Sequence, residues 1–164
     1  AEVGYAVVEE AATDVITRQQ RSGVAEPWAQ PDFIHRILAL QQQRQASSPA
    51  KTVQVFDRSP LCTLALARYL DVPVPRALSV ELDRLVEEQF YVPQALFVRP
   101  LGFVEKTAVR RISYQESLAF EALHESTYRE YGFTMVDIPA APVAERVGTV
   151  VSILRQGSFG GGNG

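Results

Sequence analysis

The sequence predicts an α/β fold with a doubly wound parallel sheet and helices on both of its faces. Apolar, strand-like segments alternate with segments of helical periodicity, which is the order expected for βαβ units. Residues 95–98 form a continuous apolar run between two prolines, which is typical of a strand buried on both faces. The 164 residues are 46% hydrophobic and 21% charged, as in an ordinary globular domain. We expect one domain over residues 1–156 and a Gly-rich, disordered tail over residues 157–164.

Four strands are predicted from short apolar or β-branched runs that lie between turn residues. The first run follows Gly4, which has the character of a residue that ends a helical turn. The last run follows Gly132, where a long helix is expected to stop. The predicted strands cover residues 5–8, 53–56, 95–98 and 133–138.

Six helices are predicted from apolar residues spaced by three and four positions and from signals at the helix ends. Ser59 and Pro60 are favourable N-cap and N1 residues. Ser113 and Glu116 match a capping box, and Pro142 opens the last helix. The predicted helices cover residues 11–20, 31–45, 60–69, 75–89, 113–131 and 142–155.

The charge balance and the cysteine count narrow the choice of partners and compartment. Lys and Arg total 16 and Asp and Glu total 19, so the net charge of −3 provides no general positive field for a nucleic acid. The single cysteine, Cys62, excludes an intrachain disulfide and favours a cytoplasmic protein. No apolar run approaches the roughly 20 residues that a membrane span requires, so no membrane partner is expected.

The segment from Val53 to Pro60 combines a strand end with reactive side chains. Asp57, Arg58 and Ser59 follow a β-branched run and lead directly into a predicted helix. In open α/β sheets, ligands bind at the carboxyl ends of the strands. Asp57 is suited to hold Mg²⁺ through water, and Arg58 is suited to bind a phosphate with two hydrogen bonds. The alternative is a surface ion pair followed by an ordinary helix cap.

Five landmarks, in order over residues 5–147, resemble the AAA-type P-loop ATP-binding domains that are related to ribosylnicotinamide kinases and, more distantly, to deoxynucleoside and thymidylate kinases. The landmarks are Tyr5–Ala12, Val55–Pro60, Phe97–Pro100, Arg110–Tyr114, and Val136–Pro139 together with Pro142–Val147. The resemblance implies a P-loop fold with ATP and Mg²⁺ as cofactors. It also implies a full-length parent that either hydrolyses ATP or transfers a phosphoryl group to a nucleoside-like small molecule.

The resemblance gives four residues near the first two strands a role in catalysis or binding. Glu10 corresponds to the carboxylate that accepts a proton from the attacking hydroxyl. Glu9 is the alternative, because successive strand side chains face opposite sides and only one of the two should face the site. Asp57 resembles the acidic residue that positions Mg²⁺, and Arg58 resembles the arginine that binds a transferred or acceptor phosphate. The alternative is that both Glu9 and Glu10 face solvent at the strand end.

The second half of the chain contributes two more elements of the resemblance. Arg110 and Arg111 lie where the family has a lid, whose arginines close over the phosphates and stabilise the charge of the transition state. The alternative is that both are ordinary loop charges. The turn at Ala140 and Ala141 resembles the backbone segment that lines the adenine.

Three further residues are candidates for ligand contacts. We expect the acceptor pocket to be built around Trp28, Phe33 and the helix that they lead into. The indole of Trp28 could stack on a substrate ring, although a place in the core is favoured. Arg99 lies at a strand end, where pairing with a carboxylate is favoured over binding of a phosphate.

The motif that defines the resembled family, G-x-x-x-x-G-K-[ST], does not occur in the sequence. In that motif the backbone N–H groups and the lysine bind the phosphates, and the Ser or Thr completes the Mg²⁺ shell. We therefore expect the sequence to be a fragment of an ATP-dependent kinase or ATPase, inactive in this form, whose acceptor is a small molecule or water. The alternative is a non-catalytic domain of the same fold that serves as a nucleotide sensor or protein-interaction scaffold.

Overall fold

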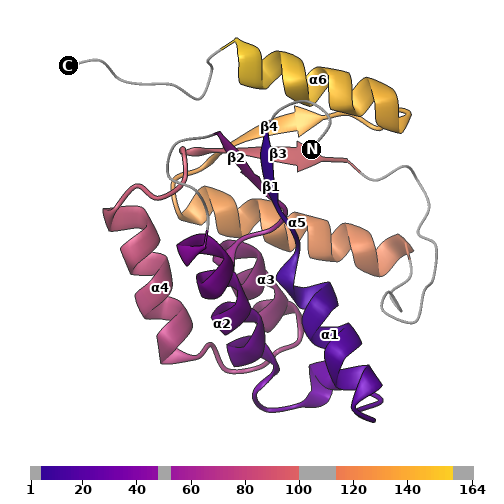
Figure 1. Ribbon diagram of the computed structural model, residues 1–164, viewed down its shortest axis with the longest axis vertical. Coiled ribbons are helices and arrows are strands. Elements are labelled where there is room, and N and C mark those ends of the chain that lie inside the picture. The colour runs from indigo at the N-terminus through magenta and orange to yellow at the C-terminus, as the bar shows by residue number, and fades with distance from the viewer. Residues whose placement is uncertain (1–4, 48–52, 100–113, 157–164) are drawn as a thin grey trace. The chain divides into compact units, whose positions relative to one another are not determined.

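The structure is a computed structural model that describes residues 5–47, 53–99 and 114–156 (Figure 1). These residues divide into two compact units. Unit 1 contains the described residues up to Leu82, and unit 2 contains those from Asp83 onward. The division falls within one continuous helix.

Unit 1 contains a pair of parallel strands, with helices both between the strands and after them in the sequence. Ala6 pairs with Gln54, and Val8 pairs with Phe56. Helices α1 and α2 contact each other, and α2 also contacts α3. The elements of unit 1 are β1 (Ala6–Val8), α1 (Ala11–Arg21), the 3₁₀ helix η1 (Pro27–Ala29), α2 (Phe33–Ala46), β2 (Gln54–Phe56), α3 (Pro60–Tyr69) and α4 (Arg76–Glu87), which continues into unit 2.

The buried residues of unit 1 follow the helical spacing that the sequence predicts. Ser59 caps α3, because its hydroxyl accepts a hydrogen bond from the N–H of Leu61 at 3.2 Å, and Pro60 occupies the first helical position. This start directs an almost entirely apolar face of α3 inward. The most deeply buried apolar side chains of unit 1 are Ala11, Phe33, Ile37, Leu38, Leu61, Leu64, Ala65, Ala67, Leu78 and Leu82.

Unit 2 is built on a second pair of parallel strands. Gln94 pairs with Thr134, and Val98 pairs with Ile138. Gly132, with a φ of +83°, ends the long helix before the second strand, as the sequence predicts. Both helices that follow β3 in the sequence contact β4. The elements of unit 2 are the end of α4, β3 (Gln94–Val98), α5 (Tyr114–Glu130), β4 (Thr134–Ile138) and α6 (Val143–Arg155).

The four predicted strands and six predicted helices are all present, and the helix over residues 60–69 has exactly the expected bounds. The prediction that residues 95–98 are buried on both faces is wrong. Ala95, Leu96 and Phe97 are only half-buried, and Val98 is 52% exposed. The reason is that the described strands form two separate two-stranded sheets rather than one sheet of four strands. Each described strand therefore has one partner, and its apolar side chains are only partly covered.

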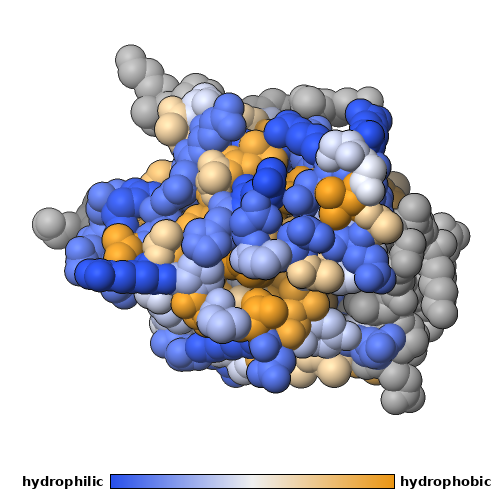
Figure 2. Space-filling view, turned by 90° about the horizontal axis from the view of Figure 1, so that it is seen from below, coloured by the Kyte–Doolittle hydropathy of each residue, from blue (hydrophilic) through white to orange (hydrophobic). Residues whose placement is uncertain are grey.

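The helical face seen from below is mostly hydrophilic, and its hydrophobic residues show as separate patches between polar ones (Figure 2). Within the described residues, none of the helices combines the length and the hydropathy that crossing a membrane requires. The predictions for residues 1–4, for the cap at Ser113 and for the tail over residues 157–164 lie outside the described residues.

Candidate functional site

The parallel register of unit 1 brings the acidic and basic residues of two separate sequence segments to one sheet edge. Because Val8 pairs with Phe56, the next residues, Glu9 and Asp57, leave their strands at the same carboxyl-terminal edge. The backbone N–H of Asp57 donates to the carbonyl of Val8 at 2.8 Å and extends the ladder to this point. The predicted meeting of these segments at the carboxyl edge therefore takes place within unit 1.

The turn after β2 has an unusual backbone at its arginine. Arg58 has a φ of +71°, in the left-handed region that disfavours residues with a Cβ atom. Ser59 then returns to an extended conformation and caps α3. The sharp turn leaves the side chains of both Asp57 and Arg58 exposed at the sheet edge. Non-glycine residues in this conformation concentrate at functional sites, so the geometry favours a binding role for the turn.

The two acidic residues after β1 have different surroundings. Glu10 is the N-cap residue of α1 and is half-buried, and its carboxylate accepts a hydrogen bond from the hydroxyl of Thr13 at 2.7 Å. This contact fixes the direction of the Glu10 side chain. Glu9 is exposed, and its backbone carbonyl accepts a hydrogen bond from Arg44.

Arg44 joins three elements at this end of β1. One terminal nitrogen of its guanidinium donates to the carbonyl of Glu9 at 2.7 Å, and the other forms an ion pair with the carboxylate of Asp14. The side chain of Arg44 is only 20% exposed, so this contact is more shielded than a typical surface pair. Arg44 of α2 therefore holds the end of β1 and the first turns of α1 in a fixed position.

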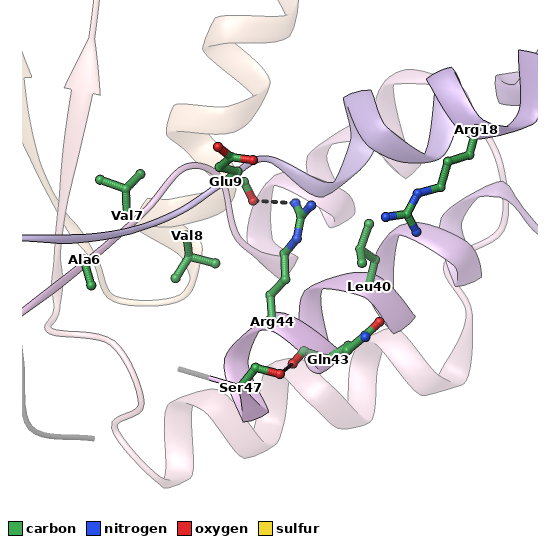
Figure 3. A pocket seen from close by; sticks show the side chains of 9 residues that line it. All are labelled: Ala6, Val7, Val8, Glu9, Arg18, Leu40, Gln43, Arg44 and Ser47. Atoms are coloured by element: carbon green, nitrogen blue, oxygen red, sulfur yellow. Dashed lines mark hydrogen bonds between the residues drawn. The ribbon is translucent and has the colours of Figure 1, made fainter. Parts of the chain in front are cut away.

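A pocket of about 520 Å³ lies beside this contact, between β1 and the helices α1 and α2 (Figure 3). Arg18 of α1 and Arg44 of α2 extend into it on either side of Leu40. Glu9 lines the same pocket, but in Figure 3 its carboxylate turns away from the two guanidinium groups. The complete lining consists of Ala6, Val7, Val8, Glu9, Arg18, Leu40, Gln43, Arg44 and Ser47.

The pocket was not predicted, and the sequence offers only a weak signal for it. Arg44 interrupts a run of glutamines in the last turns of α2, which marks it as the one charged residue of that segment. Nothing in the sequence connects it to Asp14, which lies 30 positions earlier. The pairing arises only because α1 and α2 pack against each other.

The remaining predicted site residues lie in three different places. Trp28 belongs to η1 and is half-buried, whereas Phe33 opens α2 and is 2% exposed, within the core. Ala140 and Ala141 belong to the turn between β4 and α6 in unit 2, where Ala140 is exposed. Arg110 and Arg111 lie outside the described residues.

The acidic residues do not form a direct metal cage. Among the residues that the structure describes, no cluster of three or more His, Cys, Asp or Glu side chains is arranged to hold a metal ion. Mg²⁺ usually keeps several waters and is bound through one or two carboxylates together with phosphate oxygens of the substrate. Asp57, as an exposed carboxylate at the strand edge, fits this second type of site.

Arg99 pairs with carboxylates, as expected. Its guanidinium lies 2.7 Å from Glu121, 3.4 Å from Glu125 and 2.7 Å from Asp137. These contacts raise the pKa of Arg99, mainly through the hydrogen bond to Glu121. Arg129 donates a hydrogen bond to Glu125 that, with a smaller contribution from Arg99, holds the pKa of Glu125 below its ordinary value of 4.5. The network connects β3, β4 and α5 within unit 2.

We expect the ion pairs that Glu125 forms with Arg129 and Arg99 to make unit 2 sensitive to acid. Because folding lowers the pKa of Glu125, its contribution to stability is present above pH 4.5 and is lost as the pH falls through the lower, folded-state pKa. Replacing Arg99 with glutamine should lower the free energy of unfolding at pH 7 by about 1 kcal/mol. It should also reduce part of the further loss of stability in acid, because Arg99 makes the smaller contribution to the lowered pKa of Glu125. Thermal unfolding of the full-length protein between pH 7 and pH 3 would measure both effects.

The control for this experiment is Arg36→Gln, which removes an exposed arginine paired with Asp32 in unit 1. That pair is separated by four positions on one helix and should contribute less than the Arg99 network. Identical acid profiles for the wild type and Arg99→Gln would contradict the role of the network.

A family model for an AAA domain matches residues 1–146 of the chain. The match covers most of the sequence, so the protein belongs to this family. It is therefore an AAA-type domain of the P-loop NTPase class, whose members generally bind a nucleotide together with Mg²⁺. No curated protein and no solved structure matches the chain.

Proposed function

We propose that this chain forms most of an ATP-binding phosphoryl-transfer domain, which acts either as an ATPase or as a kinase for a nucleoside-like small molecule. The observation that carries the proposal is the parallel register of β1 and β2, which brings Glu9, Glu10, Asp57 and Arg58 to one edge. Family membership supports a nucleotide as the ligand. We also propose a cytoplasmic location, because the single cysteine, Cys62, excludes an intrachain disulfide.

We further propose that both units belong to one doubly wound sheet over residues 1–156. The first strand of the family fold, together with the loop after it that carries the G-x-x-x-x-G-K-[ST] motif, would complete that sheet. The two-stranded sheets and the half-exposed apolar strand residues support this arrangement, because strands of parallel sheets are normally covered on both faces. Without that loop, we expect the chain to be inactive.

The residues at the strand edge are suited to a bound nucleotide and Mg²⁺. Mg²⁺ would be held by Asp57 through water, and a phosphate would be bound by Arg58. Bound ATP supplies the phosphoryl group for transfer. Glu10 would accept the proton of the attacking hydroxyl, with its carboxylate oriented by Thr13. Glu9 would face the acceptor, in keeping with its place in the lining of the pocket.

Other predicted residues keep the roles that the family resemblance suggests. The small side chains of Ala140 and Ala141 would leave the backbone of their turn accessible to the adenine. Arg110 and Arg111 would close over the phosphates. Trp28, which does not line the pocket beside β1, would stack on a ring of the acceptor outside that pocket, and Phe33, which is buried, would act by fixing the start of α2.

The two glutamates can be distinguished by matched substitutions in the full-length protein. Glu10→Gln should lower kcat by about 100-fold or more, because a general base contributes at least that much to the rate. Glu9→Gln should mainly raise the KM for the acceptor and leave kcat within a few fold. Steady-state kinetics of Mg²⁺-dependent ATP turnover with each variant measures both effects. Equal and mild effects of the two substitutions would rule out the general-base role.

A second candidate function is a non-catalytic nucleotide sensor or protein-interaction scaffold of the same fold. The observation that favours it is the lack of a G-x-x-x-x-G-K-[ST] motif in the 164 residues. The gene sequence before the codon of Ala1 separates the two functions. A glycine-rich loop with Lys-Ser or Lys-Thr about 20 residues upstream would support catalysis. An initiator codon directly before Ala1 would support the scaffold.

A further inference from the structure

The pocket between β1, α1 and α2 contains a charged group that nothing in the described structure neutralises. Arg18 lines the pocket from an exposed position, and its side chain forms no hydrogen bond or ion pair with any of the described residues. Its guanidinium is therefore available to a ligand.

The second guanidinium of the pocket is held in place. Arg44 is fixed by Asp14 and by the carbonyl of Glu9, as described above. A rigid arginine beside an uncommitted one is a suitable arrangement for an oxyanion, because guanidinium groups bind phosphate and carboxylate through paired hydrogen bonds. The amide of Gln43 and the hydroxyl of Ser47 add neutral hydrogen-bonding groups to the same lining.

The size of the pocket and its place in the fold indicate what kind of anion it accepts. A volume of about 520 Å³ lies in the range of small-molecule sites. The aliphatic lining from Ala6, Val8 and Leu40 suits an organic body that carries the anionic group. The pocket follows β1 up to Glu9, where that strand ends.

We infer that this pocket binds the oxyanion of an acidic small molecule, a phosphate or a carboxylate, and that Arg18 is its principal ligand. That this molecule is the phosphoryl acceptor rests on the proposed function. Its oxyanion would lie at Arg18, and its opposite end would reach toward Glu9. The acceptor is thus an acid rather than a neutral nucleoside.

The test is a titration of the isotope-labelled full-length protein with inorganic phosphate and, separately, with acetate, followed by NMR of the backbone amides. Saturating Mg²⁺-ADP keeps a phosphate-binding loop occupied, so that the probes report on the pocket. We expect phosphate or acetate to shift the amides of Val7, Leu40 and Arg44. The more effective probe tells whether the natural ligand carries a phosphate or a carboxylate.

A matched pair of variants shows whether Arg18 is responsible. Arg18→Gln should weaken binding of the effective anion by about tenfold, the value of one charge-assisted hydrogen bond. Arg21→Gln removes the same charge from the same helix at an exposed position outside the pocket lining, and should change binding less than twofold. Should Arg18→Gln fail to fold, Gln43→Glu, at an exposed position in the lining, should weaken binding to a similar extent by charge repulsion.

The outcomes separate this inference from the proposed function. Equal effects of Arg18→Gln and Arg21→Gln, or no shift with either anion, would overturn the anion pocket whatever the protein does with ATP. Calorimetric titration of the same variants with ATP and Mg²⁺ tests the nucleotide site independently. The affinity of the Arg18→Gln variant for ATP should equal that of the wild type. Anion binding without ATP binding would retain the pocket and reject phosphoryl transfer.

Discussion

Replacing Asp57 with alanine in the full-length protein is expected to reduce Mg²⁺-dependent ATP turnover by at least about 100-fold, as the loss of one preorganised electrostatic group at a reacting centre does in other enzymes. Asp57 is the exposed carboxylate at the end of β2, on the edge where Glu9 and Glu10 also leave their strand. Its removal would take away the protein group that orients the Mg²⁺ shell through water. Turnover measured over a range of Mg²⁺ concentrations is the direct readout.

Folding should be unaffected by this substitution, because the hydrogen bonds that continue the strand and cap the next helix come from backbone groups and from Ser59. Asp83→Ala, which removes an exposed carboxylate from α4, is the matched control and should leave turnover within twofold. Asp57→Asn keeps the shape of the side chain and should lose nearly as much activity as Asp57→Ala. Unchanged turnover in both Asp57 variants would remove this residue from the site.

The second large effect concerns the stability of the 164 residues on their own. We expect this segment, expressed alone, to be insoluble or to lack a cooperative unfolding transition, whereas the full-length polypeptide melts sharply. Each described sheet has only two strands, and Val7 and Val98 are 53% and 52% exposed. Two-stranded sheets are marginal without further covering elements. The free energy that is lost without the proposed central strand should exceed the roughly 5 to 15 kcal/mol that normally stabilises a domain.

Near-ultraviolet circular dichroism and calorimetry of the segment and the full-length polypeptide would measure this difference. A useful control is a full-length variant in which the lysine of the proposed upstream loop is replaced by alanine. Its phosphate binding should be lost while its cooperative melting is kept, which separates the strand's structural role from the loop's chemistry. A soluble, monomeric segment with a sharp melting transition would show that no central strand is needed.

The sequence was most informative where local signals and long-range packing agree. Ser59 and Pro60 predict the start of α3 correctly because a cap depends only on neighbouring residues. The edge that joins Glu9 to Asp57 was also predictable, because parallel strands place their carboxyl ends together. The half-exposed state of Phe97 was not predictable, because it depends on how many strands each sheet contains.

The pocket was beyond the reach of sequence patterns for a different reason. Whether Arg18 or Arg21 lines it depends on the rotation of α1 against α2, and both arginines lie in the last turn of an ordinary amphipathic helix. The partner of Arg44 is equally a matter of tertiary packing, since Asp14 belongs to another helix. Charge alone therefore identifies candidates, and only the packing of helices selects among them.

The backbone of Arg58 shows a compromise between stability and activity at the sheet edge. For the conformation at φ of +71°, glycine is the residue of lowest energy, and any side chain adds about 1 kcal/mol or more of strain. An arginine at this position is in keeping with a role for its side chain at the sheet edge that offsets this strain. Selection for thermostability alone would drive this position toward glycine, and the cost would be the loss of the guanidinium beside Asp57.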